Sequence, residues 1–339
     1  MGIDEDQAAW EKNLKFRTQR VDGEDDHRLD FFFLINDKSF IVTVCATPDS
    51  SDSITQLVSR YNQAFNEDDD DEEIQKAQGE IEDIICDAGW RKFACLAPAI
   101  EKDNSPPIFL YSVLNPETFY FRLVTDGENA DLIQEHPAES PHGPAYLHIN
   151  ITSDLPRYVA REIQFKKKFM GLGYNAHVFV NGQDMCCKIA KPGYAKAVQR
   201  EYECLKKIAD SEYARSISAP ALLGFVVDGG DDEIIGILEE HIPHATNVGR
   251  CEGGIEAVAS GRRAKWAQQI KRSIEMLHKI GIVWGDGKPE NVLVNHETDN
   301  CCLIDFGGSW TEGWVDAELR ETKEGDEQAL KRILEFLAV

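Results

Sequence analysis

The sequence predicts an α+β protein in two parts that meet near residue 158. Up to that point, apolar β-prone runs alternate with segments of helical period. Beyond it, the predicted order is strand, helix, paired strands, long helix, loop, strand and final helix. The chain has 339 residues, enough for two domains with a sizeable core. We therefore expect a small α+β domain over residues 1–158 and a second domain over residues 159–339.

Charge and cysteine content narrow the class of protein. A net charge of −24 repels nucleic acid and anionic lipid, so neither is an expected partner. The nine cysteines include no Cys-x-x-Cys pair, which argues against a zinc site or a disulfide framework. Residues 1–10 lack an apolar signal core, and no apolar run reaches the ~20 residues that cross a bilayer. We expect a soluble intracellular protein, cytoplasmic or nuclear, of undetermined oligomeric state.

The first part begins with two β-prone runs, Leu29–Ile35 and Ser39–Ala46, which predict a hairpin. A helix is expected over Ser53–Phe65, and apolar residues at helical spacing predict another over residues 74–85. Between these helices, Glu67–Glu73 is an unbroken acidic run. It is either a solvated loop or a docking tail for a basic partner.

A second hairpin is predicted from the apolar runs Ile108–Leu114 and Thr118–Thr125. Residues 126–144 are rich in Pro, Gly, His and Glu, which is typical of a loop. No pattern in residues 1–158 indicates a chemistry, so the role of this part is left open.

Glycines give the first indication of chemistry in the second part. The string Gly171-x-Gly173-x-x-Ala176-x-Val178 lies between two β-prone runs. Glycines let the backbone approach phosphates closely, and Val178 would cover a nucleotide base. Alone, such a string is more often an ordinary hairpin turn, and Ala176 replaces the third glycine of the usual motif.

Lys188 lies inside an apolar strand, where a lysine is costly unless it is paired. A phosphate and a carboxylate would pair it, whereas a strand-edge lysine that extends into water is the alternative. We expect the carboxylate from the helix that follows. Glu201 flanks the apolar face of that helix, and Glu203 is the rival.

Two further strands are predicted around the turn at residues 229–232. The second strand ends in a hinge-like segment whose backbone, at Glu240 and Ile242, suits contact with a nucleotide base. Either Leu238 or Glu239 faces the space behind that base, and the sequence does not fix which.

The strongest pattern is the string Ile282–Val294, which follows a long helix predicted over Arg262–Ile280. Phosphoryl transfer needs a carboxylate to accept a proton, a cation near the transferred phosphate, and an oxygen ligand for Mg²⁺. Asp286, Lys288 and Asn291 offer these three groups in the order that the chemistry requires.

Asp305 closes an apolar strand directly before Phe306-Gly307. This position suits a Mg²⁺ ligand that bridges phosphates, although an aspartate that caps a turn is the alternative.

From residue 161 to residue 339, the chain resembles the protein-kinase-like superfamily, because Asp286-x-Lys288-Pro289-x-Asn291 is similar to the Ser/Thr-type catalytic loop. The resemblance implies ATP and Mg²⁺ as ligands and a bilobal fold, with a β-rich lobe over 159–243 and a reduced helical lobe over 244–339. The roles that it implies are Asp286 as catalytic base, Lys288 on the phosphate, Lys188 with Glu201 as an ion pair, and Asn291 with Asp305 on Mg²⁺. Residues 200–205 and 305–316 also resemble kinase-like proteins of filamentous fungi.

The chain departs from the family pattern in three respects, and one of them is that the usual peptide-binding platform is missing. Trp284-Gly285 replaces the usual His-Arg before the catalytic aspartate, and residues 308–339 are few for an activation segment and a full helical lobe. Asp326 either bonds the catalytic-loop backbone or caps the last helix. Trp310 and Trp314 either line a substrate groove or pack in the core.

These residues favour an ATP-dependent serine/threonine protein kinase, which phosphorylates a protein hydroxyl. A small-molecule kinase of the same fold is the second hypothesis, and the reduced lobe favours it. An ATP-binding pseudokinase scaffold is the third hypothesis, and the Trp284-Gly285 replacement is its support.

Gly285 cannot bind a phosphate as an arginine would. We therefore predict that activity does not depend on phosphorylation of the segment that follows Asp305. Phosphatase-treated protein should keep its rate of ATP turnover within about two-fold. Loss of all turnover on dephosphorylation would refute this.

Overall fold

The protein consists of two compact units of mixed α and β structure, so the α+β class is confirmed. The computed structural model describes residues 28–46, 52–66, 71–98, 107–126, 129–137, 146, 148–151, 154–169, 174–229 and 233–339. The first unit is formed by Met1–Pro106 with Asn115–Gly143, and the second by Pro107–Leu114 with Pro144–Val339. Residues 144–158, which the sequence analysis placed in the first part, therefore group with the second unit.

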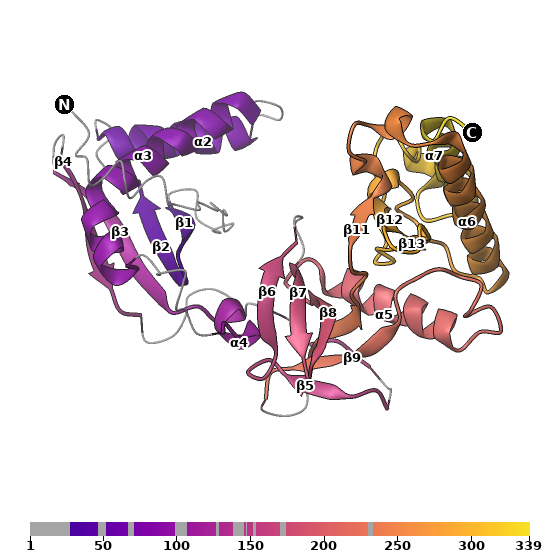
Figure 1. The fold of residues 1–339 in the computed structure, drawn as a ribbon. Coiled ribbons are helices and arrows are strands. Elements are labelled where there is room, and N and C mark those ends of the chain that lie inside the picture. The colour runs from indigo at the N-terminus through magenta and orange to yellow at the C-terminus, as the bar shows by residue number, and fades with distance from the viewer. Residues whose placement is uncertain are drawn as a thin grey trace. The chain divides into compact units, whose positions relative to one another are not determined.

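The first unit has a four-stranded sheet in the order β1-β2-β3-β4 (Figure 1). The predicted hairpin is confirmed as β1 (Arg28–Ile35) and β2 (Lys38–Cys45), which are antiparallel around Asn36 at a φ of 54°. β2 runs parallel to β3 (Thr118–Asp126), which forms a second antiparallel pair with β4 (Asn129–Glu135).

Two helices supply the rest of the core of the first unit. They are α2 (Ser53–Asn66) and α3 (Asp71–Leu96), and both were predicted from helical spacing. The Phe93 ring of α3 lies 5.0 Å from the ring of Phe40 and 5.6 Å from that of Phe121. All three rings are buried, so the helix is anchored on the sheet by edge-to-face aromatic contacts. The acidic run Glu67–Glu73 falls partly outside the described residues.

The hairpin predicted from Ile108–Leu114 and Thr118–Thr125 is wrong. Residues 110–114 form the short helix α4 (Leu110–Leu114), whose two leucines are buried one turn apart in the second unit. The true partner of β3 is β4, in a segment that was expected to be a loop. β4 buries Leu132 and leaves Ile133 exposed, so its apolar pattern was too weak to indicate a strand.

The second unit contains a six-stranded sheet in the order β5-β9-β10-β8-β7-β6. Its strands are β5 (Arg157–Val159), β6 (Gln164–Lys168), β7 (Tyr174–Val180), β8 (Gln183–Ile189), β9 (Leu222–Val227) and β10 (Ile234–Glu240). The helices α4 and α5 (Ala195–Ala209) pack on opposite faces of this sheet, because alternate residues of β9 and β10 join two different core clusters.

The rest of the second unit is mainly helical. α6 (Ser260–Lys279) and α7 (Lys323–Phe336) lie side by side, next to a small sheet in the order β11-β12-β13 (Figure 1). The small strands are β11 (Ala245–Asn247), β12 (Val292–Asn295) and β13 (Cys301–Leu303), and the 3₁₀ turns are Val248–Arg250, Ile255–Ala257, Pro289–Asn291 and Ala317–Leu319. Trp266, Trp284 and Phe306 are fully buried in the shared core. Among the described residues, no helix combines the length and apolar character needed to cross a bilayer.

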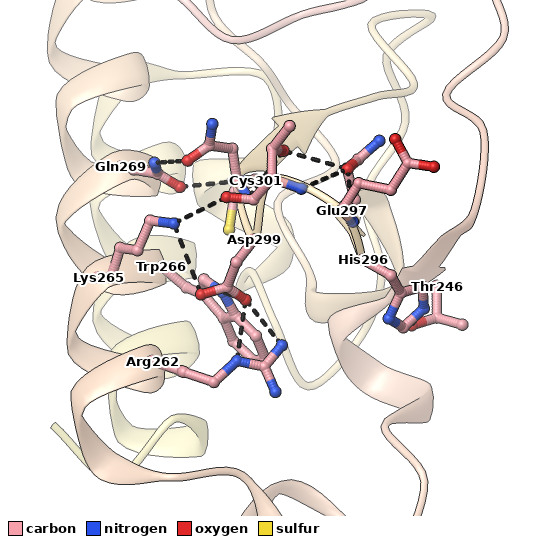
Figure 2. A network of polar contacts seen from close by, with 12 residues as sticks. Thr246, Arg262, Lys265, Trp266, Gln269, His296, Glu297, Asp299 and Cys301 are labelled. Carbon is pink, nitrogen blue, oxygen red and sulfur yellow. Dashed lines mark hydrogen bonds and ion pairs between the residues drawn. The ribbon is translucent and has the colours of Figure 1, made fainter.

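A polar network fixes the β12–β13 hairpin on α6 (Figure 2). Asp299, at a φ of 55° in the hairpin turn, accepts hydrogen bonds from Arg262 at 2.9 and 2.7 Å and from the Trp266 indole at 3.1 Å. Gln269 accepts the Cys301 N–H at 2.8 Å. Partial burial opposes ionisation of Asp299, but the Arg262 and Trp266 hydrogen bonds lower its pKa. The network therefore sets the position of both strands of the hairpin.

The Asp299 network generates a stability prediction. Asp299→Asn keeps the shape and the tolerance of positive φ but removes the charge, so it should lower the free energy of unfolding by about 1–2 kcal/mol in urea titrations. Glu297→Gln changes an exposed carboxylate of the same turn and should stay within about 0.5 kcal/mol of wild type. Equal stability of the two variants would show that the network does not hold the hairpin.

Candidate active site

The β12–β13 hairpin places two oxygen-bearing side chains at the same end of a small sheet. Asn291 directly precedes β12, and Asp305 follows β13 by two residues. The Asn291 carbonyl accepts the Ile304 N–H at 3.0 Å, which ties the two ends together. Asp305 has a φ of 65°, a conformation that is uncommon for a residue with a Cβ and concentrated at functional sites.

The Asp286 carboxylate is held by three neighbouring side chains. Its Oδ2 accepts hydrogen bonds from Lys288 Nζ at 2.6 Å and from Asn291 Nδ2 at 3.1 Å. Asn291 also donates to the Asp286 backbone carbonyl at 2.9 Å, so its amide locks the turn. Asp286 is 5% exposed, which leaves one buried carboxylate presented in a fixed orientation. The structure therefore brings together the three residues that the sequence selected from this loop.

Thr311 completes this group, and the sequence analysis missed it. Its hydroxyl donates to Asp286 Oδ1 at 2.7 Å and accepts from Lys288 Nζ at 2.8 Å. Thr311 lies 25 residues after Asp286, so no short spacing pattern pointed to it. The contact fixes the segment after Asp305 against the loop that carries Asp286.

Lys188 and Glu201 form a buried ion pair between β8 and α5. Glu201 also accepts the Phe306 N–H at 3.1 Å, which joins the pair to the residue after Asp305. The rival Glu203 is exposed and bonds Gln199, so the choice between the two glutamates falls on Glu201. Burial disfavours the charge on Lys188, but the carboxylates around it outweigh that penalty and raise its pKa well above the usual value.

Glu239 is a third buried group beside this pair. It shares the sheet face of Lys188, and its Oε2 lies 3.7 Å from Lys188 Nζ. Leu238 points to the opposite face and packs in the cluster with α4, so of these two residues Glu239 is the one on the Lys188 face. Burial first, and then the Glu201 charge, raise the pKa of Glu239 to about 8. Its Oε1 is buried without a hydrogen-bond partner.

The strand after the glycine string, β7, turns Asn175 and Val178 to opposite faces of the sheet. Lys188 pairs with Asn175 across β7 and β8, so Asn175 and His177 share its face. Ala176 and Val178 are fully buried on the opposite face, against α4. Val178, which the sequence analysis expected to cover a nucleotide base, therefore lies on the sheet face opposite Lys188. Residues 171 and 173 lie outside the described residues, so the glycine prediction stays a prediction.

Two histidines stack on the Lys188 face of the sheet. The His177 and His241 rings lie 4.2 Å apart at an interplanar angle of 14°. His177 Nε2 also lies 2.6 Å from Asp184 Oδ1. Partial burial, followed by the nearby His177, lowers the pKa of His241. An aromatic platform therefore borders the end of β10, a feature that the sequence analysis did not identify.

The expected hinge residues follow directly at the end of β10. Glu240 has an exposed side chain, and its backbone N–H donates to the Ala221 carbonyl at 2.8 Å. Ile242 is half-buried. The predicted backbone contact of these two residues with a base stays a prediction.

Asp326 braces the backbone just before Asp286. Its two carboxylate oxygens accept the Trp284 N–H at 2.8 Å and the Gly285 N–H at 2.9 Å, and it is 1% exposed. Thr322, and not Asp326, caps α7, so the first of the two readings of Asp326 is confirmed. The Trp284 indole donates to the Ile304 carbonyl at 2.9 Å, which links the segment before Asp286 to the residue between β13 and Asp305.

The two tryptophans of the C-terminal segment differ in their surroundings. Trp314 packs edge-on against Phe336 at 6.1 Å, as the core-packing alternative requires. Trp310 lines a hollow of about 430 Å³ together with Ser309, Arg320 and Glu321. Because Trp310 adjoins Thr311, the hollow lies next to the group that holds Asp286.

The donor set fits a divalent cation that is shared with phosphate oxygens. Asn291 and Asp305 offer one amide and one carboxylate, and Mg²⁺ usually completes such a pair with phosphates and water. In the described part of the chain, no three His, Cys, Asp or Glu side chains could hold a metal by themselves. The carboxylates around Lys188 outnumber its single ammonium, so they also favour the binding of a cation nearby.

Comparison with known proteins supports a kinase-like relation over a short stretch. No family model matches the chain. A stretch of 48 residues is 48% identical to the serine/threonine-protein kinase mos of Patiria pectinifera. The match spans 14% of this chain and 14% of that protein.

The buried Glu239 generates a pH prediction. Its carboxyl pKa is about 8 in the folded protein against an ordinary 4.5, so the folded state holds the proton more tightly. This stabilisation is complete below about pH 4.5 and is lost as the pH rises through about 8, and its size is on the order of 5 kcal/mol. Glu239→Gln should remove this part of the pH dependence in urea titrations, whereas Glu240→Gln should retain it. A wild-type profile kept in full by Glu239→Gln would contradict the prediction.

Proposed function

We propose that the second unit is an ATP- and Mg²⁺-dependent phosphotransferase of the protein-kinase type, which phosphorylates a Ser/Thr hydroxyl of a protein. The observation that carries the proposal is one continuous set of contacts. Lys188 pairs with Glu201, Glu201 bonds the residue after Asp305, and Asn291 joins the Asp305 end of the hairpin to Asp286. All the side chains that phosphoryl transfer requires therefore adjoin one another.

The proposed fold is bilobal. The six-stranded sheet with α5 would form the β-rich lobe, and α6, α7 and the β11–β13 sheet would form a reduced helical lobe. In this arrangement β8 and α5 contribute Lys188 and Glu201, while the β12–β13 hairpin contributes the metal ligands. The Ser/Thr kinase match over 48 residues supports the same family.

Each residue has a definite task in the proposed reaction. Asp286 would orient the acceptor hydroxyl and take its proton, because its carboxylate is fixed by Asn291 and Thr311. Lys288 would neutralise charge on the transferred phosphate, and Lys188 would hold the phosphates that remain. Bound Mg²⁺, on Asn291 and Asp305, would supply further neutralisation of phosphate charge.

A small-molecule acceptor is a second candidate because of one observation. The hollow beside Thr311 has a volume of about 430 Å³, within the range typical of small-molecule sites. Phosphoryl transfer to peptide libraries, compared with transfer to metabolite pools, separates the two substrate classes.

The test of the proposed function is Mg²⁺-dependent ATP turnover and autophosphorylation. Asp286→Asn should lower the turnover rate by about 10²–10⁴-fold, because the proton acceptor is lost while the shape is kept. Lys188→Met should abolish turnover by removing the phosphate-binding ammonium. Glu203→Gln, on the exposed face of α5, is the matched control and should keep the wild-type rate. Equal rates in all variants would rule out an enzyme that uses this site, and nucleotide binding without any turnover would favour a pseudokinase scaffold.

A further inference from the structure

Gly285 lies under the side chain of an arginine from another element. Its φ is 93°, a left-handed conformation that favours glycine. A Cβ at this position would come within 3.3 Å of both terminal nitrogens of Arg200, which belongs to α5. The guanidinium of Arg200 therefore lies directly beside the residue that precedes Asp286.

Arg200 joins three parts of the site. Its Nη2 donates to the Val283 carbonyl at 3.1 Å, in the segment before Asp286. Its Nη1 pairs with Glu321 Oε1 at 3.4 Å, and the same oxygen accepts the Ser309 N–H at 3.2 Å. A Cβ on Gly308 would meet Arg200 Nη1 at 1.9 Å, so the segment passes closely under the guanidinium.

These contacts connect Arg200 to Thr311, Asp286 and Lys288. Ser309 lies two residues before Thr311, whose hydroxyl holds Asp286 and Lys288. On the other side, Arg200 is the neighbour of Glu201 on α5. Arg200 thus connects the Lys188–Glu201 pair, the segment before Asp286 and the segment of residues 305–322.

We propose that Arg200 and Glu321 form a permanent clasp that orders residues 305–322 without phosphorylation. The proposal rests on the proposed function and deepens its regulation. Glu321 supplies a fixed carboxylate where a phosphorylated side chain would otherwise supply a switchable charge. Arg200 is a positioning residue, because it acts on Asp286 through Ser309 and Thr311 and does not touch the reacting atoms.

The clasp acts locally and adds little to global stability. The side chains of Arg200 and Glu321 are 27% and 53% exposed, so solvent screens the ion pair. Breaking it should leave the urea midpoint nearly unchanged. The loss should instead be visible in kcat, because a small displacement of Thr311 and Asp286 misaligns the acceptor hydroxyl.

The test is a double-mutant cycle on the full chain with Arg200→Met, Glu321→Gln and the double variant. Each single variant should lower kcat about 10-fold with KM for ATP within about two-fold, and the double variant should lose no more than either single one. Glu318→Gln, an exposed carboxylate of the same segment, is the matched control and should keep the wild-type kcat. Full kcat in both single variants, or additive losses, would overturn the clasp.

Amide hydrogen exchange separates the clasp from the proposed function. The Ser309 amide should exchange faster in Glu321→Ala than in wild type, whether or not the protein turns over ATP, because alanine offers no side-chain acceptor for this amide. Faster exchange with no wild-type turnover would support the clasp and refute the kinase proposal. Unchanged exchange in Glu321→Ala would overturn the clasp whatever the activity.

Discussion

The site depends on the burial of one ammonium group among several carboxylates. Lys188 is 7% exposed and Glu201 is 3% exposed, and a buried charge is tolerated only when it is paired. Pairing requires α5 to sit against β8, and Glu201 then fixes the backbone at Phe306, next to Asp305. The Lys188–Glu201 ion pair thus sets the position of α5 and the position of the loop that carries Asp305.

The backbone just before Asp286 is held by a second buried carboxylate, that of Asp326. Asp326 accepts the N–H groups of residues 284 and 285, and so α7 holds the segment that directly precedes Asp286. Arg200 of α5 contacts the same segment through the Val283 carbonyl. The Asp286 carboxylate is therefore positioned from two helices that lie far apart in the sequence.

Local patterns in the sequence predicted the parts of the site in which chemistry and spacing coincide. Asp286, Lys288 and Asn291 were recognisable because they lie close together in one loop. Thr311 was not recognisable, and Glu239 was only one of two alternatives, because their contacts with Asp286 and Lys188 are long-range and no short spacing encodes them. The face on which Val178 lies could not be predicted for the same reason. Which side chains of β7 share the face of Lys188 is set by the register of β7 with β8, and that register is a tertiary property. In the second unit, the short helix α4 was mistaken for a strand because short apolar runs suit either structure.

The most direct test of the central claim is a crystal structure of the chain with Mg²⁺ and a non-hydrolysable ATP analogue. The account predicts the non-transferred phosphates on Lys188, and a metal ion bound by Asn291 and Asp305. It also predicts the terminal phosphate beside Lys288 and facing Asp286. A nucleotide bound elsewhere on the chain, with Lys188 still closed on Glu201 alone, would contradict it.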